Sequence, residues 1–419
     1  MKPKPRILLY SHDTYGLGHL RRSLAIARRL AQDIPNVYQL LITGSMVAGA
    51  FSLPPRLDII KLPALSKRSN GQYKARALPL SLKRTISWRE QIILQAVQNF
   101  KPDIVLVDKV ADGVYGELLP SLRYIKTWLP DTLLLLGMRD IEDSPAATQL
   151  EWHTRGTYQL LDSVYDRILY YGQRNVFDPV YAYEMSVNAA VKLVPCGYIR
   201  YEQEIRPSEA VRRELGIGYK PLILVTVGGG GDGFEILKNY LEMLSTHSQN
   251  TNFHSLLVTG PLMSHQKRYQ LQNLCPPEGV TLMEFTPDLL SYMNAADLVI
   301  SMAGYNTVCE ILSLKKRAIL IPRMHTRAEQ KIRAEQLAKR KMVQMILPDA
   351  LTPHLLWETI SRNLLLPPPE QTLDINGLAH VSYAIAELLT NPELVLHGRP
   401  TRELDTSLTM LLQKKGMMI

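Results

Sequence analysis

The sequence predicts an α/β protein of two domains, each built on a parallel β-sheet covered by helices. Two glycine-bearing turns support this class: one follows the apolar run Ile7–Tyr10, and the other follows Leu222–Val227. Each has the order strand, glycine turn, helix, in which the free N–H groups of the helix start can meet an anion. The chain has 419 residues, and single hydrophobic cores stop growing at about 250–300 residues, so two domains are expected.

Short apolar runs alternate with helical patterns through the first half of the chain. Such runs, without polar alternation, are typical of parallel strands covered on both faces. The expected strands are 6–11, 37–43, 58–62, 104–107, 132–137, 167–171 and 191–194, and expected helices follow Gly18 and cover 82–100. In the first helix, Leu20 and Leu24 mark the apolar face, and Arg21, Arg22, Arg28 and Arg29 lie off that face.

A second series of strands begins after a charged segment, 200–214, that has no strand pattern. Its strands are expected at 222–227, 255–259, 280–285, 297–301, 318–321 and 342–346, with a last helix at 376–390. We therefore expect an N-terminal domain at 1–200, a C-terminal domain at 201–380, and a C-terminal helix and tail at 381–419 that packs back on the N-terminal domain.

Composition indicates a soluble globular protein of the cytoplasm. Hydrophobic residues make up 46% and charged residues 21% of the chain. No run approaches the roughly 20 apolar residues of a membrane-spanning helix, and the N-terminus leads straight into a strand without a signal peptide. Cys196, Cys275 and Cys309 match no disulfide or metal spacing, so neither a disulfide nor a metal centre is expected.

Basic residues are concentrated in the first third of the chain. Residues 1–130 hold 20 Lys and Arg against 8 Asp and Glu, and the segment from Lys61 to Arg89 holds eight basic residues and no acid, interleaved with leucines and Trp88. Two interpretations stay open: a solvated loop running into a helix, or a surface for anionic lipid headgroups or an anionic acceptor. No nucleic-acid-binding motif accompanies the charge, so nucleic acid is not an expected partner.

Candidate site residues lie where strands end, because ligands of open parallel sheets bind beyond the carboxyl ends of the strands. In the first domain we expect this edge to hold His19, Asp108, Arg139 and Asp140. In both domains we expect the glycine turn to lie at the same edge. Neither turn is a P-loop, since no Gly-x4-Gly-Lys-[Ser/Thr] occurs, and Gly16-Leu17-Gly18 lacks the third glycine of a dinucleotide-binding fingerprint.

The segments 301–312 (SMAGYNTVCEIL) and 322–330 (PRMHTRAEQ) are the most specific motifs. In the order of its elements, the stretch 222–346 resembles the C-terminal domain of glycosyltransferase family 28. In that family a Ser-x-x-Gly turn is followed by Thr and then Glu, and a Pro-x-x-His stretch is followed by Gln. The turn Gly16-x-Gly18-His19 resembles the N-terminal turn of GT-B enzymes, and 107–118 with Arg139-Asp140 resembles uncharacterised bacterial predicted glycosyltransferases. The resemblance implies the GT-B fold, with two Rossmann-like parallel-sheet domains facing across a cleft. It also implies metal-independent, inverting transfer of a hexose-type sugar from a nucleoside diphosphate, UDP by analogy.

The resemblance also implies a set of donor-binding residues. Glu310 would bind the ribose hydroxyls, although Thr307-x-x-Glu310 also fits a helix capping box. Gln330 would contact the sugar, and the family more often has Gln where this chain has Glu329, so the sugar stays open. His325 would contact the donor or only pack within its turn. The remaining expected donor contacts are Gly228, Gly229, Gly230, Gly304 and Thr307.

On the acceptor side, His19 is the candidate general base, since it starts a helix whose positive end should lower its pKa and keep it neutral. Asp108 and Asp13 are the reserve bases, and Gly16 and Gly18 form the turn. Arg139 would either bind a phosphate of the acceptor or hold Asp140. No cofactor is expected beyond the nucleotide-sugar substrate.

Other functions remain open on the sequence alone. The pattern Gly-x-Gly-His-x-x-Arg also resembles the turn of nucleotide-sugar hydrolases. Nucleotide-sugar epimerases share the architecture. A non-catalytic nucleotide-sugar-binding protein is a third alternative, if His19 has only a structural role. The acceptor is not readable: a lipid-linked or membrane-surface acceptor suits the basic region, and a small soluble molecule is the alternative. The expected location is the cytoplasm, and peripheral binding to the inner face of the membrane stays open.

Overall fold

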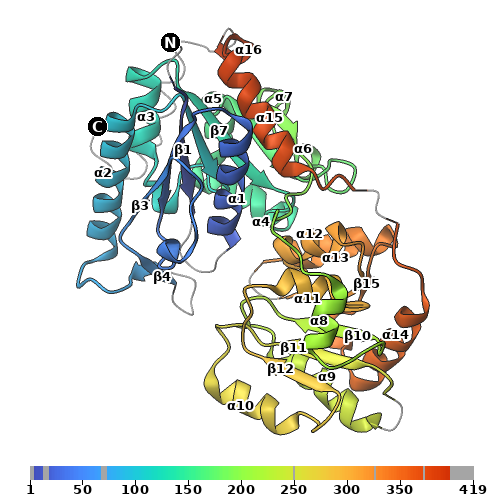
Figure 1. Cartoon of the computed structure of the whole chain (residues 1–419). Coiled ribbons are helices and arrows are strands. Elements are labelled where there is room, and N and C mark those ends of the chain that lie inside the picture. Colours follow the sequence, from blue (N-terminus) through green and yellow to red (C-terminus); the bar gives the residue numbers. More distant parts are fainter. Residues whose placement is uncertain are drawn as a thin grey trace. The chain divides into compact units, whose positions relative to one another are not determined.

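The computed structural model describes residues 4–12, 18–67, 73–248, 251–324, 327–370 and 373–396. The chain forms two compact units (Figure 1). Unit 1 combines Met1–Ile199 with Asn376–Ile419, and unit 2 is Arg200–Ile375. The chain therefore returns to unit 1 after completing unit 2.

Unit 1 is built on a seven-stranded parallel sheet with the order β3-β2-β1-β6-β7-β8-β9. The strands are β1 (Arg6–Ser11), β2 (Tyr38–Thr43), β3 (Leu57–Lys61), β6 (Ile104–Asp108), β7 (Leu133–Arg139), β8 (Arg167–Tyr171) and β9 (Leu193–Pro195). Leu8 of the central strand β1 lies beside Leu40 of β2 and Val105 of β6. All are buried or nearly so, as expected for a sheet covered on both faces.

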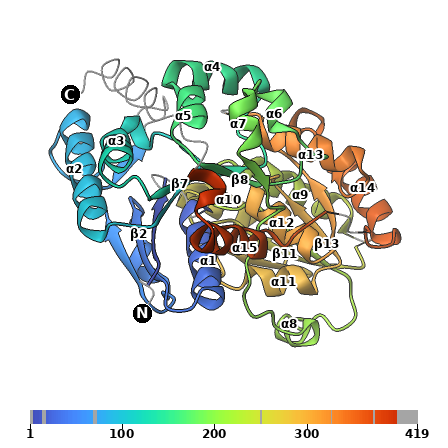
Figure 2. The ribbon, with the colours of Figure 1, turned by 90° about the horizontal axis from the view of Figure 1, so that it is seen from above.

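Helices cover both faces of this sheet. α2 (Leu82–Phe100), α3 (Leu119–Trp128), α4 (Pro145–Arg155) and α5 (Thr157–Ser163) share one apolar core with alternate residues of the strands. α1 (Gly18–Asp33) packs beside α15 (Gly377–Thr390), as Figures 1 and 2 both show. The short elements are η1 (Ala48–Ala50), η2 (Val114–Gly116), α6 (Pro179–Ala182), α7 (Val187–Val191) and α16 (Glu393–Leu396).

The helix α15 is held to unit 1 at its first residue. The N–H of Gly377 donates to the carbonyl of Tyr198 at 3.1 Å. A Cβ on Gly377 would lie 2.8 Å from that backbone, so the approach requires glycine. His380, one turn on, places Nδ1 at 2.9 Å from the carbonyl oxygen of Cys196.

Unit 2 contains a six-stranded parallel sheet with the order β12-β11-β10-β13-β14-β15. The strands are β10 (Leu222–Thr226), β11 (His254–Val258), β12 (Val280–Met283), β13 (Leu298–Ser301), β14 (Arg317–Leu320) and β15 (Gln344–Met345). The helices are α8 (Ser208–Glu214), α9 (Phe234–Thr246), α10 (His265–Leu274), α11 (Leu289–Ala295), α12 (Tyr305–Ser313), α13 (Glu329–Lys339) and α14 (Pro353–Leu365), with η4 at Pro348–Ala350. α9, α10 and α14 share one core with the sheet.

Two parallel sheets of this kind confirm the predicted fold class. Every predicted strand of the two main sheets is present, with ends shifted by at most two residues. The interpretation of the segment from Lys61 to Arg89 as a solvated loop running into a helix is wrong in part, because β4 (Leu65–Lys67) and β5 (Tyr73–Ala75) form an antiparallel hairpin. Within the described residues, none of the helices has the length and apolar character needed to span a bilayer.

One basic residue of the segment from Lys61 to Arg89 is buried in the interior of unit 1. Arg89 is buried, with Nε and Nη2 donating to the two carboxylate oxygens of Glu117 at 2.5 and 2.6 Å, and with Nη1 donating to the carbonyl of Pro63 at 2.7 Å. Tyr10 donates its hydroxyl to the same carboxylate at 2.5 Å. Arg89 therefore ties α2 to the chain that enters the hairpin, and it belongs to no surface.

The glycine turn after β10 depends on Gly230. Its φ is +89°, and an added Cβ would lie 2.1 Å from the carbonyl oxygen of Thr259. The next residue, Gly231, has no heavy atom within 4 Å of an added Cβ.

We expect Gly230→Ala to lower the free energy of unfolding of unit 2 by about 3 kcal/mol, since backbone must move to admit the methyl group. Gly231→Ala is the matched control and should change it by less than about 0.5 kcal/mol. Urea unfolding followed by circular dichroism measures both. Equal stabilities of the two variants would contradict the packing described for Gly230.

Candidate functional site

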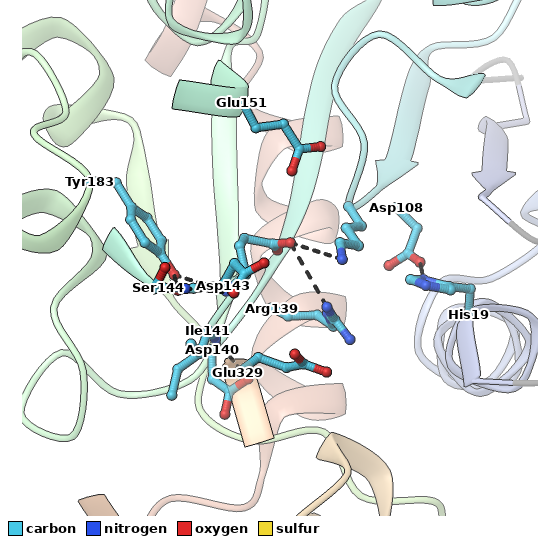
Figure 3. A network of polar contacts seen from close by, with 12 residues as sticks. His19, Asp108, Arg139, Asp140, Ile141, Asp143, Ser144, Glu151, Tyr183 and Glu329 are labelled. Atoms are coloured by element: carbon cyan, nitrogen blue, oxygen red, sulfur yellow. Dashed lines mark hydrogen bonds and ion pairs between the residues drawn. The ribbon is translucent and has the colours of Figure 1, made fainter. Parts of the chain in front are cut away.

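His19 and Asp108 meet at the carboxyl edge of the sheet in unit 1. β1 and β6 are adjacent and parallel, so the residues that follow β1 lie near the last residue of β6. His19 is the second residue of α1, and Asp108 ends β6. The Nδ1 atom of His19 lies 2.5 Å from Oδ2 of Asp108, and the two side chains point toward each other in Figure 3.

Arg22 completes this group from one turn further along α1. Its Nη2 lies 2.8 Å from each oxygen of Asp108, and its Nε donates to Oδ1 at 3.0 Å. The side chains of Arg22 and Asp108 are only 2% and 5% exposed, and that of His19 is 20% exposed. Arg22 was predicted to lie off the buried face of this helix, and that prediction is wrong, because an ion pair compensates its burial.

The contacts at Nδ1 decide which nitrogen of His19 is basic. An ionised carboxylate only accepts hydrogen bonds and a guanidinium only donates them. Asp108 lies at 2.5 Å from Nδ1 and Nη2 of Arg22 at 2.9 Å. The closer carboxylate favours the tautomer with the proton on Nδ1, which leaves the lone pair on Nε2.

Burial is the largest influence on the pKa of His19. It lowers the pKa of His19 from 6.5 to about 4, with Asp108 opposing the shift and Arg22 and Arg139 adding to it. The predicted direction is confirmed, but burial and not the helix end is the main cause. Burial alone would raise the pKa of Asp108, yet Arg22 and His19 outweigh it and hold that pKa well below its usual range. His12, whose ring meets that of His19 edge-on at 5.9 Å, also has a pKa lowered by burial.

Arg22 is positioned by a tyrosine that sequence reasoning did not find. Its guanidinium carbon lies 5.7 Å from the ring centroid of Tyr171, at the end of β8. A Cβ on Gly137 of β7 would lie 2.2 Å from the Tyr171 hydroxyl. Gly137 therefore leaves the room in which Tyr171 packs.

Arg139 ends β7 and Asp140 follows it, at the same edge of the sheet (Figure 3). Nη2 of Arg139 lies 3.9 Å from Oε2 of Glu142, and Nζ of Lys109 lies 3.1 Å from the same oxygen. Asp140 is buried and accepts the N–H of Ile141 at 2.8 Å. Gly18 begins α1, whereas Gly16 and Asp13 lie outside the described residues.

In unit 2, α12 starts directly beyond β13, and its N-cap residue is Gly304. Thr307 lies within the first turn, so it does not cap the helix, and the capping-box interpretation of Glu310 is wrong. Glu310 is buried on α12. Buried Arg333 of α13 donates through Nη1 to the carbonyl of Ala303 at 2.7 Å and stacks on Tyr305 at 5.7 Å, which fixes the turn that leads into α12.

The glycine turn after β10 has exposed and buried members. Gly228 and Gly229 are exposed. Gly230 is buried and donates its N–H to the carbonyl of Val227 at 3.2 Å. The first two glycines thus expose backbone to solvent, and the third shapes the turn.

Glu329 and Gln330 begin α13, and both hold Arg323. Gln330 accepts the backbone N–H of Arg323 at 3.0 Å, and Glu329 accepts from its guanidinium at 2.8 Å. His325 lies outside the described residues. Across the described residues, no group of three or more His, Cys, Asp and Glu side chains could hold a metal ion.

Residues 222–385 match the model of the glycosyltransferase family 28 C-terminal domain. A UDP-N-acetylglucosamine–N-acetylmuramyl-(pentapeptide) pyrophosphoryl-undecaprenol N-acetylglucosamine transferase of Alkaliphilus metalliredigens is 31% identical over 343 residues, which cover 80% of this chain and 84% of that protein. The chain belongs to glycosyltransferase family 28. A transferase of the same description from Alkaliphilus oremlandii is 25% identical over 81% of this chain and 85% of its own length.

The similarity to solved structures shows the fold of this family 28 member. The crystal structure of Acinetobacter baumannii MurG has a TM-score of 0.58 at 18% identity, covering 92% of this chain and 100% of that chain. A putative UDP-N-acetylglucosamine 2-epimerase from Listeria monocytogenes has a TM-score of 0.61 at 12% identity, over 94% and 97% of the two chains. The predicted GT-B fold and the predicted glycosyltransferase class are therefore confirmed.

The ionisation of His19 can be tested in the ligand-free protein. We expect its imidazole to stay neutral, with the proton on Nδ1, down to about pH 5 and to titrate near pH 4. Between pH 6.5 and 4 the unfolded chain then binds a proton that the folded chain does not, so the free energy of unfolding falls as pH drops through this range. Nitrogen-15 NMR of labelled histidines measures the titration, and His19→Gln assigns the resonance. A midpoint at or above 6.5 would contradict the environment described.

Proposed function

We propose that this family 28 glycosyltransferase transfers a hexose from a uridine diphosphate donor, with UDP-N-acetylglucosamine as the first candidate, to a hydroxyl of a lipid-linked acceptor. The observation that carries the proposal is the His19–Asp108 pair at the carboxyl edge of the unit 1 sheet. The substrates in the names of the two Alkaliphilus relatives support the choice of donor and acceptor.

The donor half of the proposal rests on unit 2. The first N–H groups of a helix lack acceptors within the helix, and they favour an anion. The start of α12 at Gly304 and the exposed backbone of Gly228 and Gly229 would bind the diphosphate. The Glu310 carboxylate would accept hydrogen bonds from the two ribose hydroxyls, because its two oxygens match a vicinal diol.

The acceptor half rests on unit 1. Nε2 of His19 would take the proton of the acceptor hydroxyl as that oxygen bonds to the anomeric carbon. The bond from that carbon to the diphosphate breaks on the opposite face, so the sugar inverts and the diphosphate leaves with its electron pair. The ionised carboxylate of Asp108 would stabilise the imidazolium of His19 as it forms, and the ion pair with Arg22 keeps that carboxylate ionised.

His19→Gln should lower kcat for transfer by at least about 100-fold, the usual worth of a general base, and leave the Kd for UDP within twofold. The assay follows labelled UDP-N-acetylglucosamine with and without an N-acetylmuramyl-pentapeptide pyrophosphoryl lipid. His354→Gln, exposed on α14, is the matched control. Unchanged transfer by His19→Gln would refute the base, and donor consumption as fast without acceptor would indicate a hydrolase instead.

A membrane-bound acceptor would also need the protein at the membrane. We propose that the basic surface serves this role; it consists of Lys61, Lys74, Arg76, Lys83 and Arg84 with the apolar Leu78 and Trp88, all exposed. Cations attract anionic headgroups, and Trp88, 45% exposed, has the amphipathic character of interfacial residues.

The double variant Lys83→Gln, Arg84→Gln should bind vesicles of 30% phosphatidylglycerol at least about tenfold more weakly, since each basic residue near such a surface is worth about 1 kcal/mol. Sedimentation with vesicles at 0.1 M salt measures this. Lys238→Gln with Lys331→Gln removes two exposed charges from unit 2 as the control. Equal losses by both double variants would show a general charge effect and no specific surface.

A further inference from the structure

Arg323 connects three elements at the carboxyl edge of the unit 2 sheet. It follows β14, and its Nη1 lies 3.2 Å from Oδ2 of Asp232 in the glycine turn after β10. Its Nη2 lies 2.8 Å from Oε1 of Glu329, the first residue of α13. Arg323 lies within the motif 322–330, but no role was predicted for it from the sequence.

The strand order brings the contact between Arg323 and Asp232 across the end of a third strand, β13. The sheet runs β10-β13-β14, so β13 lies between the strands that lead to Asp232 and to Arg323. A contact between the ends of the outer two strands must pass across the carboxyl end of β13. The turn to Gly304 and the first residues of α12 begin there.

The hydrogen bonds of Arg323 are unevenly secured. The side chain of Glu329 is 8% exposed, whereas that of Asp232 is 56% exposed. An ion pair with an exposed carboxylate contributes only about 0–1 kcal/mol. Nε of Arg323 is buried and has no hydrogen-bond partner among the described residues, and the same is true of Oε2 of Glu329. The guanidinium is therefore anchored through Nη2 by Glu329, whereas its Nη1 is held only by an exposed carboxylate.

We propose that Arg323 binds the diphosphate of the donor, with Nη1 donating to a phosphate oxygen in place of Asp232 while Glu329 holds Nη2. This rests on the proposed function. A hydrogen bond from a guanidinium to a phosphate oxygen is charge-assisted, and the charge of Arg323 adds to the partial charges of the backbone amides as the leaving group gains charge. Arg333, a second arginine near this turn, donates instead to the carbonyl of Ala303.

Asp232 then has a definite role as a competitor. Its carboxylate occupies the same donor, Nη1, that the diphosphate would take, and its charge repels the ligand. Removing the charge of Asp232 should therefore strengthen nucleotide binding, whereas removing Arg323 should weaken it. A pair that only holds the turn in place would instead weaken binding when either partner is lost.

Isothermal titration with UDP and with uridine at 0.15 M salt tests this. Arg323→Gln should raise the Kd for UDP about tenfold and leave that for uridine unchanged, and Arg323→Lys should raise it about threefold. Asp232→Asn should lower the Kd for UDP about threefold. Lys331→Gln, which removes an exposed charge from the same helix α13, is the matched control and should change the Kd by less than twofold.

The outcomes separate this inference from the proposed function. If the wild-type chain binds no UDP, the donor assignment fails and the role of Arg323 fails with it. If the wild-type chain binds UDP and Arg323→Gln binds it equally well, the role of Arg323 alone is refuted. Equal weakening by Asp232→Asn and Arg323→Gln would also refute it, because the pair would then be structural. Melting temperatures without ligand show that each variant is folded.

Discussion

Parallel strand direction is the constraint on which the candidate sites depend. Every strand pair in the two main sheets is parallel, so each sheet has one edge at which all its strands end. The chain must leave every strand at that edge, and it does so in turns whose backbone groups are not used by the sheet. In unit 1 this edge holds His19 and Asp108, and in unit 2 it holds Gly228, Gly304 and Arg323. Residues distant in the sequence meet there without any local signal.

Two buried carboxylates at or beyond the strand ends of unit 1 are each compensated by an arginine. In unit 1, Asp108 has Arg22, and Glu117 has Arg89 together with the Tyr10 hydroxyl. Removing one partner of such a buried pair typically costs about 3–5 kcal/mol, because the other charge remains without water. The two pairs therefore constrain the geometry of the sheet edge strongly, even where their net contribution to stability is small. The same burial keeps His19 neutral, which a base requires before it accepts a proton.

Sequence patterns predicted the sheets well and the site only in part. Apolar runs such as Leu222–Val227 report burial on both faces, which is a local property, so the strands could be predicted. Arg22 and Arg323 could not, because their partners Asp108 and Asp232 lie 86 and 91 positions away. Helical periodicity alone placed Arg22 off the buried face. The capping-box interpretation of Thr307 failed for a related reason: Arg333, from another helix, fixes the turn that starts α12 earlier.

The contacts of Arg323 also give a physical reason for Glu329. A glutamine at this position would offer one neutral acceptor, whereas the carboxylate offers a charged acceptor to a guanidinium that is mostly shielded from water. Charge-assisted hydrogen bonds are about twice as strong as neutral ones, so a glutamate there and an arginine at 323 favour each other. Asp232, exposed at the other end of the same guanidinium, is attached too weakly to serve as its permanent partner. The three residues are therefore best understood as one unit, in which a buried carboxylate sets the position of the cation and an exposed one can be replaced by a ligand.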